Sequence, residues 1–161
     1  MINKNYKIIL LVFLLMITFT MTSCKKSVTI EKYSEMDRII YKSVLSNSDR
    51  YLVFIYGNDC SACEELEPTI AKYATLSKNN SKKYTPLYVM NASSTRLNKG
   101  LIKNDSEYDS FVGTTNYEDI HIATTPALLV IENHKVIKYI STKVTTKPKT
   151  DIKEYFTELM K

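Results

Sequence analysis

Blocks of apolar residues separated by short polar turns run along the chain, and each block predicts one element. The run Tyr51–Tyr56 is rich in β-branched and aromatic residues, and its length and composition are those of a buried central strand. After the polar turn Gly57–Asp59, apolar residues recur at intervals of three and four, which predicts an amphipathic helix to about Ser77. A polar loop follows, and Tyr84–Met90 has the composition of a second strand.

The two ends of the chain continue this pattern. Ala127–Ile131 is predicted to be a third strand, Glu132–Lys135 a four-residue turn, and Val136–Ile140 the returning strand of a hairpin. Thr150–Met160 has the apolar spacing of a C-terminal helix. Near the other end, apolar residues of Glu31–Ser46 recur at helical intervals, so we expect an amphipathic helix whose apolar face lies in the core.

The segment 92–123 has the weakest periodicity, and we expect it to be a variable helical insertion. Apolar residues predict one short helix at 97–102 and another at 108–112, with Asp105 or Ser106 as the cap of the second helix.

These elements define a fold class. The early strand–helix–strand unit should pair its strands in parallel through a right-handed crossover, and the hairpin adds an antiparallel strand. The expected fold is therefore α/β, with a mixed central sheet of about four to five strands and helices on both faces. A chain of 161 residues, 44% of them hydrophobic, suits one domain with a substantial core.

Residues 1–23 resemble a bacterial lipoprotein signal. Two lysines precede an apolar run of about fourteen residues, which is shorter than the roughly 20 that a membrane span needs. The segment ends Thr22-Ser23-Cys24, similar to the signal in which the cysteine is lipidated and becomes the new N-terminus, although Met21 stands where leucine is usual. The alternative is an uncleaved anchor helix. Both place the folded part outside the cytoplasmic membrane.

The resulting organisation is a signal peptide at 1–23, a tether at 24–30 with a lipid on Cys24, and a domain at 31–161. The formal net charge is +5, and the lysines of the signal segment, which contains no acid, supply two of those charges. The remaining +3 is too mild, and the lysines too dispersed, to indicate nucleic acid. Only three glycines are present, so a Gly-rich phosphate loop is not available. We expect no cofactor, no nucleic-acid partner and a monomer.

Cys60 and Cys63 carry the candidate chemistry. Cys60 lies where a strand gives way to a helix, and the unpaired N–H groups and the dipole of that helix favour a thiolate, the reactive form of cysteine. The two-residue spacing lets the Cys63 sulfur reach Cys60 across one helical turn, which suits thiol–disulfide exchange. The alternatives are a static disulfide and a zinc site. Zinc needs four ligands, and the domain adds only His121 and His134, so we expect no metal.

The whole pattern resembles the thioredoxin-like superfamily. The C-x-x-C motif follows a buried strand, and Pro68 stands five residues after Cys63, as the family's helix-kinking proline does. Thr125-Pro126 precedes a strand, as does the family's cis-proline, and the strand, turn and strand that follow are also similar. The resemblance covers roughly residues 31–161 and implies a thioredoxin fold.

Several positions depart from the thioredoxin pattern. Phe54 stands where thioredoxins carry a buried acid, Asp59 replaces the tryptophan before the first cysteine, and Ser61-Ala62 replaces Gly-Pro. The segment before Pro126 is also longer. These departures fit the exported thioredoxin-like lipoproteins and the small proteins called bacteriocin transport accessory proteins.

The resemblance implies roles for individual residues. Cys60 would be the nucleophile and Cys63 the resolving thiol. Pro126, if cis, would place Thr125 beside the sulfurs, where its backbone could pair with an extended substrate strand; the alternative is an ordinary trans proline. Further residues expected to line the substrate site are Tyr56, Asp59, Ser61 and Ala62, with core packing as the alternative for the tyrosine.

The expected function is that of a membrane-tethered, extracytoplasmic thiol–disulfide oxidoreductase. Its partners would be protein or peptide thiols and disulfides, and an unidentified redox partner. The acids Asp59, Glu64 and Glu65 oppose a thiolate on Cys60, and a less stable thiolate makes the protein more reducing, which favours a reductant or isomerase. The alternative is an accessory peptide-binding module, for example for a secreted bacteriocin, in which redox turnover is secondary.

Overall fold

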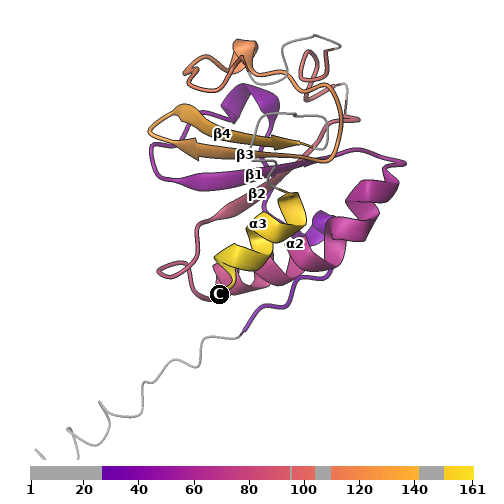
Figure 1. The fold of residues 1–161 in the computed structure, drawn as a ribbon, viewed down its shortest axis with the longest axis vertical. Coiled ribbons are helices and arrows are strands. Elements are labelled where there is room, and N and C mark those ends of the chain that lie inside the picture. The colour runs from indigo at the N-terminus through magenta and orange to yellow at the C-terminus, as the bar shows by residue number, and fades with distance from the viewer. Residues whose placement is uncertain (1–26, 95, 104–109, 142–150) are drawn as a thin grey trace, which may run out of the picture.

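A computed structural model describes residues 27–94, 96–103, 110–141 and 151–161 (Figure 1). The expected signal peptide, the lipidation site Cys24, and the proposed caps Asp105 and Ser106 lie outside the described residues. No helix within the described ranges is long and apolar enough to cross a membrane.

A four-stranded mixed sheet forms the centre of the domain, in the order β2-β1-β3-β4 (Figure 1). Strand β1 (Tyr51–Tyr56) pairs in parallel with β2 (Leu87–Asn91) and antiparallel with β3 (Ala127–Glu132). Strand β4 (Lys135–Ser141) returns antiparallel to β3. The expected α/β class and mixed sheet are therefore confirmed.

Strand β1 is apolar throughout because both of its faces are covered. Leu52 and Phe54 point into the core shared with the α-helices, whereas Val53 and Ile55 point into the core on the opposite face. All four side chains are fully buried. This double burial explains why β1 is a continuous hydrophobic run rather than an alternating one.

The two faces of the sheet carry different kinds of helix. Helices α2 (Ser61–Asn79) and α3 (Ile152–Leu159) pack on the same face, side by side (Figure 1). Among the described residues, the opposite face carries only single 3₁₀ turns, η2 (Tyr41–Ser43) and η3 (Tyr117–Asp119). Within the described residues the α-helices therefore lie on one face of the sheet, and only 3₁₀ turns lie on the other.

The predicted helix at Glu31–Ser46 is wrong. This segment contains two 3₁₀ turns, η1 (Tyr33–Glu35) and η2, joined by an extended stretch in which Arg38 pairs with Val89 of β2. Tyr33 lies in the core on the α2 side and Tyr41 in the core on the other side. The segment therefore crosses the edge of the sheet, which one face of a straight helix cannot do.

The predicted helix at 97–102 is also wrong. Leu101 is buried, but Leu97 and Ile102 are exposed, and Ile102 pairs with Ile122 in an isolated bridge. Within 92–123, the described residues form turns, η3 and this bridge. The chain buries Leu101 through backbone pairing with the later segment instead of through a helical face.

Smaller differences concern the ends of elements. The hairpin turn spans Glu132–Lys135 as expected, although its outer residues also pair with each other as the last residues of the two strands, and its central residues Asn133 and His134 have positive φ (51° and 59°). Two positive φ values are what a two-residue hairpin turn requires, because they match the twist of the strands. Pro68 lies inside α2 as expected.

Candidate active site around the Cys60–Cys63 disulfide

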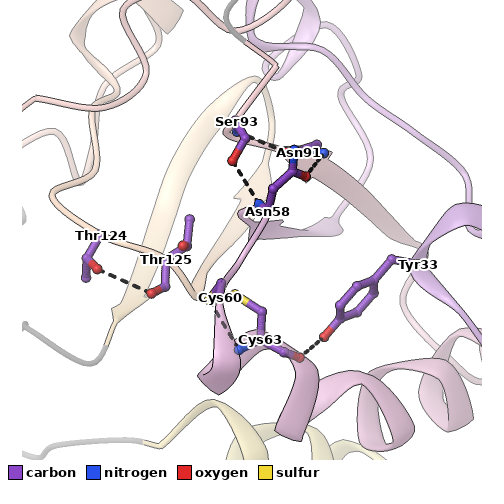
Figure 2. The surroundings of a disulfide bond; sticks show 8 residues. All are labelled: Tyr33, Asn58, Cys60, Cys63, Asn91, Ser93, Thr124 and Thr125. Carbon is purple, nitrogen blue, oxygen red and sulfur yellow. Dashed lines mark hydrogen bonds between the residues drawn. A yellow bond between two sulfur atoms is a disulfide. The ribbon is translucent and has the colours of Figure 1, made fainter.

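Cys60 and Cys63 are joined by a disulfide at the start of α2 (Figure 2). Cys60 is the N-cap residue and is half-buried, whereas Cys63 is only 2% exposed. The two sulfurs therefore differ in access, and a substrate can reach the Cys60 sulfur more readily than the Cys63 sulfur.

The first turn of α2 directs backbone N–H groups towards Cys60. The Cys63 N–H lies 2.9 Å from the Cys60 carbonyl oxygen and 3.3 Å from the Cys60 Sγ. Helix α2 has 19 residues, so the positive end of a long helix dipole also lies at this sulfur. Both features stabilise negative charge on Cys60 Sγ once the disulfide is reduced.

The flanking residues of the motif lie at the surface. Asp59, Ser61 and Ala62 are all exposed, and Asp59 has a positive φ of 54° in the turn before the helix. They are the chain neighbours of Cys60 at the exposed start of α2.

Tyr33 is hydrogen-bonded to the first turn of α2, a contact that the sequence did not reveal. Its hydroxyl donates a hydrogen bond of 2.6 Å to the Cys63 carbonyl oxygen (Figure 2). Its ring stacks on Tyr56, with centroids 4.7 Å apart, and packs at 5.3 Å against Phe54. Tyr56 is thus linked to the site through Tyr33. Phe54, at the position where thioredoxins carry a buried acid, supports the Tyr33 ring with an apolar side chain.

The protonation of Tyr33 is fixed by its surroundings. Burial, and then the nearby carboxylate of Glu67, raise the pKa of Tyr33 well above its usual value. The Glu67 carboxylate also accepts the Tyr33 backbone N–H at 2.8 Å. Tyr33 therefore remains a neutral hydroxyl donor to Cys63 over the physiological range.

A polar network positions the loop that leads into Cys60 (Figure 2). The Asn58 N–H donates to Ser93 Oγ at 2.8 Å, and the Asn91 side chain donates to Asn58 Oδ1 at 3.0 Å. The Ser93 N–H in turn donates to Asn91 Oδ1 at 2.9 Å. Asn58 and Ser93 follow the carboxyl ends of the parallel strands β1 and β2, and Asn91 is the last residue of β2. Because those ends meet at one edge of the sheet, the network joins the two loops there.

Thr125 and Pro126 lie against the same loop. The Thr125–Pro126 peptide bond is cis, the geometry that the resemblance implied, and Pro126 is buried. A Cβ atom on Gly57 would lie 2.9 Å from Thr125 Oγ1, so the loop and the threonine are in direct contact. The Thr124 hydroxyl donates to the Thr125 carbonyl oxygen at 3.3 Å (Figure 2).

Within the described residues, no group of three or more His, Cys, Asp and Glu side chains could hold a metal ion. His134 lies in the hairpin turn, where its Nδ1 is 2.8 Å from the Leu45 carbonyl oxygen. His121 is half-buried beside Phe111. The two histidines that a zinc site would need are thus engaged elsewhere.

The fold is thioredoxin-like. The sheet order β2-β1-β3-β4, with a disulfide at the start of the helix that follows β1, decides this. No protein-family model and no curated protein matches the chain.

Two solved structures are similar at low sequence identity. One comes from a study of the thiol-resolving mechanism of the yeast mitochondrial 1-Cys peroxiredoxin through the glutathione and thioredoxin systems. Its TM-score is 0.45 and its identity 8%, over 68% of this chain and 85% of that chain. The other is mitochondrial thioredoxin 3 from Saccharomyces cerevisiae in its oxidised form. Its TM-score is 0.44 and its identity 10%, with the same coverage of both chains.

Proposed function

We propose that this protein is a thiol–disulfide oxidoreductase that acts outside the cytoplasmic membrane on protein or peptide substrates. The observation that carries the proposal is the unequal access within one disulfide. Cys60 is half-buried at the N-terminus of a long helix. Cys63 is buried, and its carbonyl oxygen accepts a hydrogen bond from the Tyr33 hydroxyl. One accessible and one shielded sulfur are what a nucleophile and a resolving thiol require.

In the reducing direction, the Cys60 thiolate attacks one sulfur of a substrate disulfide. A bond forms between Cys60 and that sulfur, the substrate S–S bond breaks, and the leaving sulfur departs as a thiolate that takes up a proton. The Cys63 thiolate then attacks Cys60 Sγ, which forms the Cys60–Cys63 disulfide and releases the second substrate thiol. Two electrons pass to the substrate, and a dithiol partner must then supply two electrons to reduce the Cys60–Cys63 disulfide again.

The same steps in reverse donate a disulfide. The acids Asp59, Glu64 and Glu65 flank the motif and oppose a thiolate on Cys60, although all three are exposed and therefore screened. Because these acids weaken the effect of the helix N-terminus on the Cys60 thiolate without cancelling it, we propose a reductant or isomerase role over that of a primary oxidant.

The experiment that tests this function is trapping of covalent intermediates. Cys63→Ala should accumulate mixed disulfides between Cys60 and substrate proteins, because no thiol remains to resolve them. Cys60→Ala should accumulate few. Non-reducing gels and mass spectrometry measure both, and equal trapping by the two variants, or none by either, would reject the assignment of roles.

An accessory peptide-binding module remains the alternative function. Replacement of both cysteines by alanine separates the two: a binding module keeps its biological function, and an exchange enzyme loses it.

The proposed location rests on Cys24. If this cysteine carries a diacylglyceryl group, the mature protein partitions into detergent and Cys24→Ala abolishes that partitioning. Mass spectrometry of the mature N-terminus is the direct test, and an intact Met1 would contradict lipid anchoring.

A further inference from the structure

Lysines that are dispersed in the sequence gather around one cleft in the fold. An open cleft of about 450 Å³ lies on the sheet face opposite α2, between η2, η3 and the loop after β2. Its cations are Lys42, Arg96, Lys99 and Lys103, and Glu118 is the single acid among its described lining residues. None of these four cations forms a salt bridge within the described part of the chain.

The cleft is built on a fixed scaffold. The Tyr41 hydroxyl donates to the Ile120 carbonyl oxygen at 2.8 Å, and the Tyr41 ring meets Tyr117 edge-on at 5.3 Å. Asn98, only 5% exposed, accepts the Tyr41 N–H at 2.9 Å and donates to the Asn91 carbonyl oxygen at 2.7 Å. Tyr41 and Tyr117 both line the cleft, so the cations share it with aromatic side chains that are fixed by these contacts.

This scaffold is continuous with the disulfide site. The residue that Asn98 contacts, Asn91, also donates to Asn58, which lies two residues before Cys60. The wall of the cleft and the loop of the reactive cysteine therefore belong to one hydrogen-bonded network. A molecule held in the cleft is held by the same unit that positions Cys60.

We propose that the cleft binds an acidic segment of the protein substrate, and that it thereby sets substrate preference. The inference rests on the proposed exchange function. Four cations that form no salt bridge with the described residues, together with Tyr41 and Tyr117, complement carboxylates that alternate with apolar side chains. The cations come from two chain segments and are all exposed, so their charge is spread along the cleft, which suits an extended segment better than a compact anion.

A lipid surface is disfavoured by where the chain enters the domain. Both backbone polar groups of Val28 bond to the side chain of Asn79, at the end of α2. A lipid on Cys24 would keep the membrane near that end, on the side of the sheet away from the cleft.

Binding of short fluorescent peptides, followed by anisotropy at low salt, tests the cleft without any redox step. One peptide alternates Glu with Tyr, and its control carries Gln in place of Glu. We expect the wild type to bind the Glu peptide at least about tenfold more tightly, because several exposed charge pairs of two- to fivefold each combine. Raised salt should remove most of that preference.

Matched charge reversals locate the site. Lys42→Glu with Lys99→Glu should weaken binding of the Glu peptide by about tenfold or more. Lys72→Glu with Lys153→Glu, on exposed positions of α2 and α3, makes the same change in net charge and should alter binding by less than about threefold. Equal losses in both double variants, no preference for Glu over Gln, or equally strong binding to anionic vesicles or inorganic phosphate would overturn the proposal.

A rate measurement separates this proposal from the proposed function. Wild type should reduce a disulfide peptide flanked by Glu faster than its Gln counterpart, and Lys42→Glu with Lys99→Glu should abolish the difference while leaving the rate with uncharged hydroxyethyl disulfide unchanged. If hydroxyethyl disulfide is not reduced at all, the exchange function fails. If it is reduced but the Glu peptide has no advantage, the acidic-substrate proposal fails.

Discussion

Replacement of Gly57 by alanine tests the contact between the loop of Cys60 and the loop of Thr125. The new Cβ would lie 2.9 Å from Thr125 Oγ1, a separation that real Cβ atoms essentially never show, and 3.5 Å from Ser93 Oγ. A threonine side chain is stiff at χ1, so Thr125 cannot readily turn away. One of the two loops must therefore shift.

The size of the effect follows from two opposing contributions. Overpacking of a tight contact costs about 1–3 kcal/mol of the free energy of unfolding. The φ of Gly57 is not in the left-handed region, so alanine also restricts the unfolded chain, which contributes about 0.4–1 kcal/mol in favour of folding. Removal of the Thr125 hydroxyl leaves 3.5 Å as the shortest remaining contact, which is ordinary packing.

A double-mutant cycle measures the contact. Urea unfolding of the wild type, Gly57→Ala, Thr125→Ala and the double variant should give a coupling energy of about 1–3 kcal/mol, with Gly57→Ala harmless or stabilising once Thr125 is alanine. A coupling energy below about 0.5 kcal/mol, the level at which distant sites are additive, would show that the two loops do not touch as described.

Three other predictions concern the surroundings of the site. Tyr33→Phe removes the hydrogen bond from the hydroxyl to the Cys63 carbonyl but keeps the ring stacking, so the free energy of unfolding should fall by about 1 kcal/mol. Tyr33→Ala also removes the ring and should cost about 3–5 kcal/mol. Equal losses for the two variants in denaturant unfolding would contradict this. Burial raises the pKa of Tyr73 to about 12. The resulting contribution to the free energy of unfolding, roughly 3 kcal/mol, is fully present below about pH 10 and is lost as the pH rises to 12. The free energy of unfolding of Tyr73→Phe should therefore depend less steeply on alkaline pH, and an unchanged dependence would refute the assignment. Asp59→Asn should make the protein more oxidising by at most about 20 mV, because an exposed charge acts weakly; a shift to more reducing potential in glutathione buffers would reverse our reasoning.

The central sheet could be predicted from the sequence because its strands carry local signals. Strands β1 and β3 are buried on both faces, so each is an unbroken apolar run that no other element of that length explains. The cysteine pair at the start of α2 could also be predicted, because the C-x-x-C spacing and the helical periodicity after it lie within one short stretch.

The segment 31–46 misled the sequence analysis for a physical reason. Its buried residues recur at intervals close to those of a helix, yet Tyr33 and Tyr41 serve opposite faces of the sheet. Periodicity records how often a side chain is buried and not which core it enters. An edge-crossing segment can therefore have the spacing of an amphipathic helix.

Contacts between distant residues could not be predicted from the sequence. Tyr33 supports the active-site helix through a backbone carbonyl thirty residues away, and no side-chain pattern encodes such a bond. Lys42 and Lys99 are far apart in the sequence, and only the packing of η2 against the loop after β2 brings them to one cleft. The site is thus recognisable locally, whereas its support and its charged surroundings depend on the tertiary fold.

Equilibration of the Cys60–Cys63 pair with glutathione buffers of known potential tests the central claim most directly. The fraction of oxidised protein, measured by thiol alkylation and mass spectrometry, should follow a reversible two-electron curve with a midpoint between about −120 and −270 mV, the range of known thiol–disulfide exchange proteins. A pair that stays oxidised below about −300 mV would be a structural disulfide, and the proposed exchange function would then be wrong.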